Sequence, residues 1–121
     1  MKPGELNERL IDFAVMVITV ADGLSNTRAS NHIAGQMIRS GTSPALNYGE
    51  AQSGESRKDF IHKLQVVLKE LRETMNALKI IDKAKMFKDS TLLQRTLKEN
   101  NELISIFVTS ITTAKRNDKD E

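Results

Sequence analysis

A group of six polar residues in the middle of the sequence could come together to carry out acid–base or metal chemistry, or to neutralise charge. The group consists of Arg39, Ser43, Asn47, Glu50, Glu70 and Glu73. Three of them, Ser43, Asn47 and Glu50, follow one another at steps of four and three, which puts them on one face of a helix. If the segment that carries Glu70 and Glu73 packs beside that face, the carboxylates meet. Clustered carboxylates bind a divalent cation or act as general acid and base.

The same six residues also fit a structural role, and the sequence favours it. Arg39 would neutralise a carboxylate, and Asn47 would fix how two helices align, as buried polar groups do in bundles. The two imidazoles, His32 and His62, have no carboxylate or second histidine at ligand spacing, and the Glu-x-x-His pairs of di-iron bundles are absent. We therefore predict a partly buried polar network, no metal and no cofactor.

Motifs for nucleophilic catalysis and phosphate binding are absent from the sequence as well. It has no cysteine, which removes thiolate chemistry, disulfides and sulfur-ligated metals. No Gly-x-Ser-x-Gly turn or Ser-x-x-Lys pair marks an activated serine, and no glycine-rich loop could cradle a phosphate. We expect no catalytic residues, no small-molecule substrate and no enzymatic activity.

Basic side chains are the remaining candidates for function. From Ser56 to Lys88, nine Lys and Arg residues stand against four Asp and Glu. We predict that the following contact nucleic acid: Arg57, Lys58, Lys69, Arg72, Lys83, Lys85 and Lys88. Each phosphate contact releases counterions and adds affinity. Tyr48 and Phe87 are the aromatic residues that could stack on bases, so binding is expected to ignore base sequence. The alternative is a solvated lysine-rich face without a ligand.

Apolar residues at alternating steps of four and three define the elements that carry these side chains. In the last segment the steps run through Leu93, Leu97, Asn100, Ile104 and Phe107, the spacing of one packed helix face. Four such helices are predicted, over about residues 5–24, 28–52, 56–81 and 90–115, with a frayed tail at 116–121. Joined by short turns, they predict a single all-α domain over residues 1–121, an antiparallel up-down-up-down four-helix bundle.

Four residues give local detail to this prediction. Pro44 lacks a backbone donor and should kink the second helix near Ser40 and Gly41. Ser56 should cap the third helix, with Asp59 three residues on, and Ser90 or Thr91 should cap the fourth. Asn100 occupies a position on the packed face, where a buried amide would set how two helices align.

Residues 5–24 carry more apolar side chains than one core face needs. Beside the main stripe lie Ile11, Val15 and Ile18, which we predict to form a contact between subunits; the alternative is a slightly wider core face. The apolar run is about half of the ~20 residues that a membrane span requires, and the first residues lack the apolar core of a signal peptide. We expect a cytoplasmic protein without a membrane partner.

The middle of the chain resembles a bacterial family of four-helix bundles, the 23S rRNA-intervening sequence proteins. The resemblance rests on Gln36-Met37-Ile38-Arg39 with Ser43, Asn47 and Glu50, and on Ser56-Arg57-Lys58-Asp59-Phe60, Leu64 and Glu70-Leu71-Arg72-Glu73-Thr74. It covers the stretch from Gln36 to Leu78, and the outer helices by pattern alone. It implies a ring-like homo-oligomer, commonly a pentamer, with no biochemical activity established for the family.

A related branch of these proteins accompanies the reverse transcriptases of diversity-generating retroelements and binds both nucleic acid and the polymerase. By that resemblance the expected partners are RNA or DNA, a reverse transcriptase, and further copies of the chain. Two functions therefore remain open at this point. One is a nucleic-acid-binding accessory protein that contacts phosphates through its Lys/Arg-rich face, and the other is a homo-oligomeric interaction scaffold that binds no nucleic acid.

Overall fold

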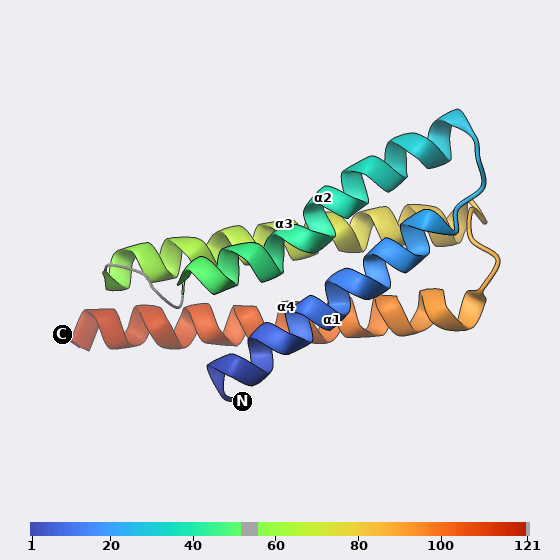
Figure 1. The fold of residues 1–121 in the computed structure, drawn as a ribbon. Coiled ribbons are helices and arrows are strands. Elements are labelled where there is room, and N and C mark those ends of the chain that lie inside the picture. The colour runs from blue at the N-terminus through green and yellow to red at the C-terminus, as the bar shows by residue number, and fades with distance from the viewer. Residues whose placement is uncertain (52–55, 121) are drawn as a thin grey trace.

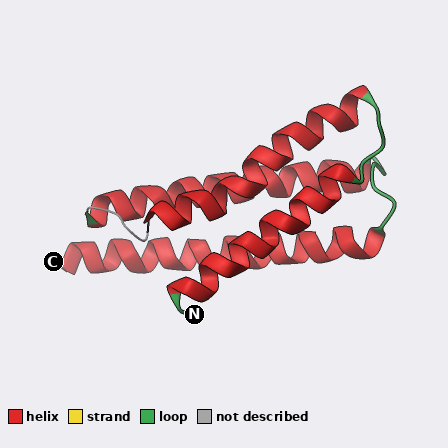
Figure 2. Cartoon of the chain, viewed as in Figure 1, coloured by secondary structure: helices red, strands yellow, loops and turns green. Residues whose placement is uncertain are grey.

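The computed structural model describes residues 1–51 and 56–120, with side chains as far as Asn117. It contains α1 (Pro3–Asp22), α2 (Arg28–Ala51), α3 (Arg57–Lys83) and α4 (Ser90–Asp120). No strand occurs in the described ranges, as Figure 2 shows. Each helix packs on the next along the chain and α1 also meets α4, so the four helices form a closed antiparallel bundle (Figure 1). The predicted all-α four-helix bundle is confirmed.

The core of the bundle is aliphatic with two central phenylalanines. Phe13 and Phe107 are fully buried, and both belong to one cluster that takes the predicted apolar positions from all four helices. Phe107 also meets the Tyr48 ring edge-on, with ring centroids 5.6 Å apart. Because apolar side chains recur about once per turn on each helix, one face of every helix can reach this centre.

The ends of the helices follow local capping chemistry, and one predicted cap is wrong. The Ser56 hydroxyl accepts a hydrogen bond from the Asp59 amide at 3.1 Å, as expected for the start of α3. At the start of α4 the cap is Asp89 and not Ser90 or Thr91, because the Asp89 carboxylate accepts from the Leu92 amide at 3.0 Å. A carboxylate at this position also interacts favourably with the positive end of the helix dipole.

Two helices extend beyond their predicted ends. The tail that was expected to fray from residue 116 onward is helical as far as Asp120, and α3 runs to Lys83 rather than residue 81. After α3 the chain turns at Lys85, whose φ is 55°, and the Met86 amide donates back to the Ile81 carbonyl at 3.0 Å. Two predictions concern positions outside the described residues, namely the last residue of the second helix, Gln52, and the final residue of the tail.

Close backbone approach joins α1 to α2. Gly41 is buried on the side of α2 that faces α1, and a Cβ atom there would lie 2.5 Å from a γ carbon of Val17. Three residues further along α2, Pro44 leaves the Ser40 carbonyl without its usual helical donor. The two halves of α2 run in visibly different directions in Figure 1, which agrees with the kink predicted from Pro44.

The contact between α1 and α4 is less extensive than the contacts between helices that follow one another along the chain. An ion pair across it holds the two helices together. In Figure 1, α1 crosses α4 at an angle. The Arg9 guanidinium donates to both carboxylate oxygens of Glu99 at 2.7 Å and to Glu102 at 2.7 Å. The hydrogen bond to Glu99 raises the pKa of Arg9, with attraction to Glu99 and Glu102 adding to it against burial. A bidentate contact of this kind fixes the orientation of the Arg9 guanidinium against the Glu99 carboxylate as well as the distance between them.

Candidate nucleic-acid interface

The outer face of α3 carries an uninterrupted row of polar and basic side chains. Positions at alternating steps of four and three, opposite the core-facing residues, are all exposed. We call this row the α3 basic stripe; it consists of Lys58, His62, Gln65, Lys69, Arg72, Asn76, Lys79 and Lys83. None of the eight is acidic. Because steps of four and three keep residues on one side of a helix, all of its charges point away from the bundle in one direction.

The structure places the seven predicted basic residues in three different settings. Lys58, Lys69, Arg72 and Lys83 lie on the α3 basic stripe. Arg57 is half-buried at the start of α3, off the line of the stripe. The remaining two, Lys85 and Lys88, are exposed in the turn between α3 and α4, beyond the last residue of the stripe.

That turn is held against the turn between α1 and α2. A Cβ atom on Gly23 would lie 2.5 Å from the Phe87 ring, so the ring fits only because a glycine stands there. The Ser25 amide also donates to the Met86 carbonyl at 3.4 Å. Lys85 and Lys88 are therefore presented from a fixed turn, next to the end of the α3 basic stripe.

The aromatic side chains are buried or partly buried in the bundle. Phe87 packs against the core and Gly23, and Tyr48 is 5% exposed, with its ring edge on Phe107. Phe13 and Phe107 are fully buried, and Phe60 is half-buried against the core. The prediction that Tyr48 could stack on bases is therefore wrong, because its ring fills the bundle. Phe87 is partly buried, and its contact with Gly23 holds the ring in place.

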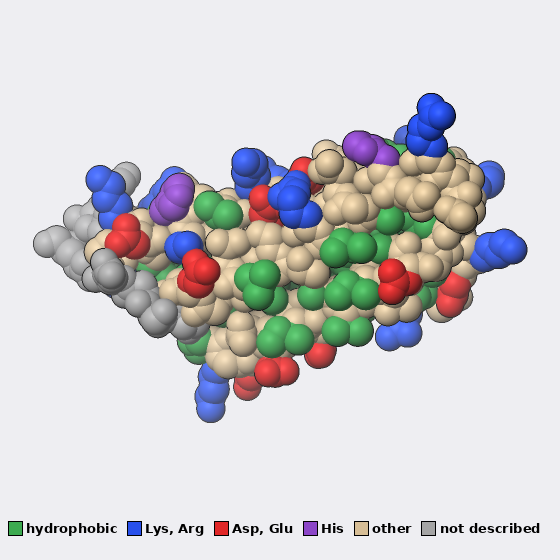
Figure 3. Space-filling view, turned by 45° about the horizontal axis from the view of Figure 1, so that its top comes forward, with side chains coloured by type: hydrophobic (Ala, Val, Ile, Leu, Met, Phe, Trp, Pro, Cys, Tyr) green, Lys and Arg blue, Asp and Glu red, His purple; other side chains and the backbone are tan. Residues whose placement is uncertain are grey.

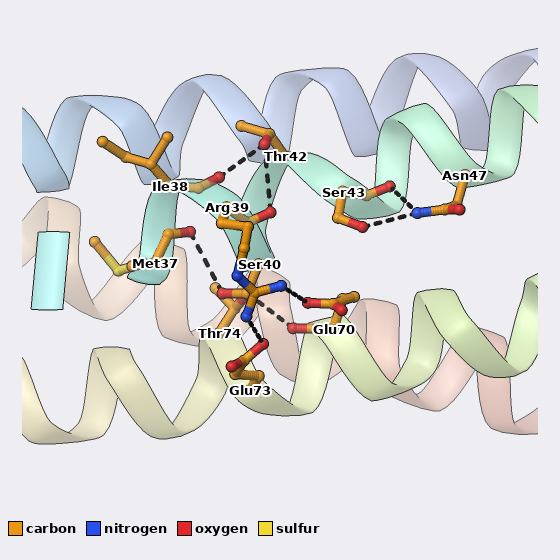
Figure 4. A network of polar contacts seen from close by, with 10 residues as sticks. All are labelled: Met37, Ile38, Arg39, Ser40, Thr42, Ser43, Asn47, Glu70, Glu73 and Thr74. Atoms are coloured by element: carbon orange, nitrogen blue, oxygen red, sulfur yellow. Dashed lines mark hydrogen bonds and ion pairs between the residues drawn. The ribbon is translucent and has the colours of Figure 1, made fainter. Parts of the chain in front are cut away.

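Arg39 brings Glu70 and Glu73 together across the contact between α2 and α3 (Figure 4). Its guanidinium donates to Glu70 at 3.1 Å and to Glu73 at 2.5 Å. The Glu70 side chain is only 12% exposed, whereas those of Arg39 and Glu73 are about half exposed. Beneath the ion pair, the Thr74 hydroxyl lies 2.8 Å from the hydroxyl of the fully buried Ser40. Charge neutralisation and hydrogen bonding thus join the two helices.

The surroundings shift the pKa values of Glu70 and Glu73 in opposite directions. The hydrogen bond from Arg39 lowers the pKa of Glu73. Burial raises the pKa of Glu70, as does its closeness to Glu73, against the attraction of Arg39. Glu73 therefore stabilises the fold above its unfolded pKa and loses that contribution as the pH falls, whereas Glu70 stabilises the fold more as it gains a proton. Their effects on acid stability oppose each other.

The other predicted members of the polar network lie apart from this cluster. The Asn47 amide donates to the Ser43 carbonyl at 3.0 Å and to the Ser43 hydroxyl at 2.7 Å, within α2, as Figure 4 shows. Glu50 pairs with Lys63 of α3 at 2.6 Å. In the described part of the chain, no three His, Cys, Asp or Glu side chains come close enough to hold a metal ion. The six residues therefore form three separate contacts rather than one site.

Apolar side chains remain exposed on the outer face of α1 and α2. Ile11, Val15 and Ile18 are 40%, 57% and 39% exposed. On α2, Ile38 and Leu46 are 36% and 69% exposed, and the contact of Gly41 with Val17 sets the two helices so that these residues extend the same face. We call these five residues the α1–α2 apolar face; hydrophobic side chains gather in the middle of the view in Figure 3.

Six residues of these surfaces were not among those predicted from the sequence: His62, Gln65, Asn76 and Lys79 on the α3 basic stripe, and Ile38 and Leu46 on the α1–α2 apolar face. Lys79 belongs to the α3 basic stripe, and its spacing could have placed it there, since Arg72, Asn76, Lys79 and Lys83 are separated by four, three and four residues. Leu46 extends the α1–α2 apolar face, but nothing in its own sequence pattern distinguishes an exposed leucine from a buried one.

In the part of the chain that the structure describes, none of the helices combines the length and the apolar content that a membrane crossing requires.

Comparison with known proteins identifies one matching family. The family model described as 23S rRNA-intervening sequence protein matches residues 5–108, which extends the resemblance beyond Gln36–Leu78 into the outer helices. The chain is also similar to a solved structure of a protein of unknown function from the S23 ribosomal protein family of Bacteroides thetaiotaomicron. The two share 28% identity and a TM-score of 0.82, over 93% of this chain and 99% of that chain. No curated protein matches the chain.

Proposed function

Since the chain belongs to the family of 23S rRNA-intervening sequence proteins, we propose that it is a non-enzymatic accessory protein that binds nucleic acid through phosphate contacts. The observation that carries the proposal is the α3 basic stripe, an exposed row without an acidic member that runs along the whole helix. Phosphate contacts by Lys and Arg release counterions and supply sequence-independent affinity. No exposed aromatic residue among those described accompanies the stripe, so base sequence is not read by stacking.

Charges near the stripe support this proposal further. Beside Lys69 and Arg72, the exposed carboxylate of Glu73 is paired with Arg39 and therefore competes less for these two cations. Asp59 and Asp82 are exposed beside Lys58 and Lys83, so the net positive charge is greatest in the middle of the stripe. The exposed Lys85 and Lys88 add positive charge at one end of the stripe. A local excess of one sign raises the local concentration of an oppositely charged ligand and speeds its association.

Charge reversal in the middle of the stripe tests the proposal. In titrations of a labelled structured RNA, we expect the double variant Lys69→Glu with Arg72→Glu to bind at least tenfold more weakly than the unaltered protein. Each lost phosphate contact should also reduce the slope of log affinity against log salt by about one. The matched control reverses two exposed cations of α4, Lys98→Glu with Lys115→Glu. Equal losses in both variants would mean that net charge, and not the stripe, governs binding.

The α1–α2 apolar face supports a second proposal, that copies of the chain assemble with one another. Three of its members, Ile11, Val15 and Ile18, lie on one side of one helix and are each more than a third exposed. Apolar patches of this kind on a small protein commonly mark a protein contact. A ring of subunits, a pentamer by the resemblance above, would also repeat the α3 basic stripe and multiply the phosphate contacts.

Introducing a charge into this face tests the assembly. We expect sedimentation velocity to show an oligomer for the unaltered protein and monomers for Val15→Asp, because assembly would bury the new carboxylate. The control Asn101→Asp adds the same charge to an exposed position of α4 and should leave the oligomer intact. An unaltered protein that stays monomeric, or a Val15→Asp variant that still assembles, would rule out this face as the contact.

A further inference from the structure

We infer that the ligand of the α3 basic stripe is a double helix, contacted along its sugar–phosphate backbone over about one helical turn, and not a single strand. The inference rests on the proposed function and goes beyond it by naming the form of the nucleic acid. It is carried by three features of α3: the length of the stripe, the grouping of its charges, and the absence of any stacking surface beside it among the described residues.

The length of the stripe matches one turn of a duplex. Between Lys58 and Lys83 the helix rises by about 37 Å, at 1.5 Å per residue. A duplex rises 3.4 Å for each base pair, so the stripe can lie alongside about 11 base pairs. Since α3 packs against both α2 and α4, it presents the charges on a rod that its neighbours support. A rigid row suits a stiff partner whose phosphates are already ordered.

The charges on the stripe fall into separate groups. Lys58 stands near the start, Lys69 and Arg72 in the middle, and Lys79 and Lys83 at the end. The centres of the last two groups are about 16 Å apart along the axis. In B-form DNA this is comparable with the separation of the phosphate ridges that border the major groove, which is about 12 Å wide.

The residues between these groups are polar side chains other than Lys and Arg: His62, Gln65 and Asn76. Polar side chains of this kind can donate hydrogen bonds to phosphate and sugar oxygens.

A single strand would find little to bind on this surface. Proteins that hold single strands combine a positively charged groove with aromatic side chains on which bases stack. Here the stripe follows the convex outer side of a helix, and Tyr48, Phe60 and Phe87 are occupied in the bundle. A flexible strand would therefore lose conformational freedom on binding and gain no stacking in return. A duplex avoids both losses, because its bases stay stacked within the helix.

The experiment compares a duplex with its own strands. The probes are a labelled DNA duplex of two turns, about 21 base pairs, an RNA duplex of the same sequence, and the separate strands, each titrated with the full-length protein at several salt concentrations. We expect both duplexes to bind at least tenfold more tightly than the strands. For duplex DNA, five cations predict a slope of log affinity against log salt of about −4 to −5. The variant Lys79→Glu with Lys83→Glu should lower duplex affinity at least tenfold, and Lys98→Glu with Lys115→Glu should not.

The outcomes separate this inference from the proposed function. Strands that bind as tightly as duplexes, with a loss in Lys79→Glu with Lys83→Glu, would overturn the duplex inference and leave nucleic-acid binding through the stripe standing. Duplex binding that the stripe variants do not weaken would overturn the assignment of the stripe itself. If none of the probes binds at low salt, both the proposed function and the inference are wrong.

Discussion

Replacing Asn100 with aspartate is expected to destabilise the protein at pH 7 by about 4 kcal/mol, and to cost far less in acid. Asn100 is fully buried between α4 and α3. With its amide oriented to satisfy both neighbours, it donates to the Leu71 carbonyl at 3.0 Å and accepts from the Met75 amide at 3.1 Å. A carboxylate could accept from Met75, but it could not donate to Leu71 and would carry a buried charge.

The pH dependence follows from the aspartate's own proton. Burial would raise the pKa of an aspartate at residue 100 in the folded state by roughly three units, at 1.36 kcal/mol for each unit. Because the folded state then binds the proton more tightly, stability falls as the pH rises from about 3.9 through the folded-state pKa. When protonated, the carboxyl has one donor and one acceptor, and can replace the amide in both hydrogen bonds. Urea unfolding at several pH values measures the difference from the unaltered protein.

Asn100→Leu is the matched control. Leu71 and Met75 stand one helical turn apart in α3, so the carbonyl of one and the amide of the other still bond to each other when Asn100 is removed. We expect this variant to lie within about 1.5 kcal/mol of the unaltered protein, with no added pH dependence. If Asn100→Asp follows the same pH profile as the unaltered protein, the amide at this position is not in a dry contact between the helices.

Gly41→Ala is expected to destabilise the protein, although alanine favours helices over glycine. The new Cβ would lie 2.5, 2.9 and 3.0 Å from three carbons of the Val17 side chain. Valine has little rotamer freedom in a helix, so α1 and α2 would have to move apart. Overpacking of this kind costs about 1–3 kcal/mol, which outweighs a helix-propensity gain of at most about 1 kcal/mol. The midpoint of urea unfolding gives the sign directly.

The same helix contains an internal control with the opposite expected sign. Gly35 lies on the outer side of α2, and nothing lies within 4 Å of a Cβ built on it. Gly35→Ala should therefore stabilise the protein by about 0.5–1 kcal/mol. Adding Val17→Ala to Gly41→Ala makes room for the new methyl group, so the double variant should be more stable than the sum of the two single effects. Equal stabilisation by both alanine substitutions would contradict the close approach of α1 and α2.

The errors in the predicted helix ends have local causes. Asp89, Ser90 and Thr91 are all competent caps, and the sequence does not say which of three neighbouring side chains will reach the free amides. The structure selects Asp89. The tail was expected to fray because terminal segments are commonly poorly ordered, yet α4 continues to Asp120. Helix ends depend on a few local contacts, whereas helix positions depend on a long apolar repeat.

The aromatic residues show what a one-dimensional pattern leaves out. From the sequence, Tyr48 and Phe87 were candidates to stack on bases. In the structure the Tyr48 ring is buried against Phe107, and the Phe87 ring packs on Gly23 and is partly buried. Each of these contacts joins residues that are distant along the chain. Conversely, Lys79 could have been added to the basic residues from its spacing alone, because the face opposite a regular apolar repeat is also regular.

The sequence by itself determined the number and position of the helices, the antiparallel bundle and the family, because the periodicity of apolar residues and short motifs are properties of neighbouring positions. It also contained the α3 basic stripe, since charges at steps of four and three share a helix face whatever surrounds them. Only the tertiary structure decided how six polar residues divide into three contacts, and which apolar side chains of α1 and α2 stay exposed. Those outcomes depend on how far one helix is rotated and shifted against the next, and at Gly41 and Asn100 that fit is set by atoms from separate helices.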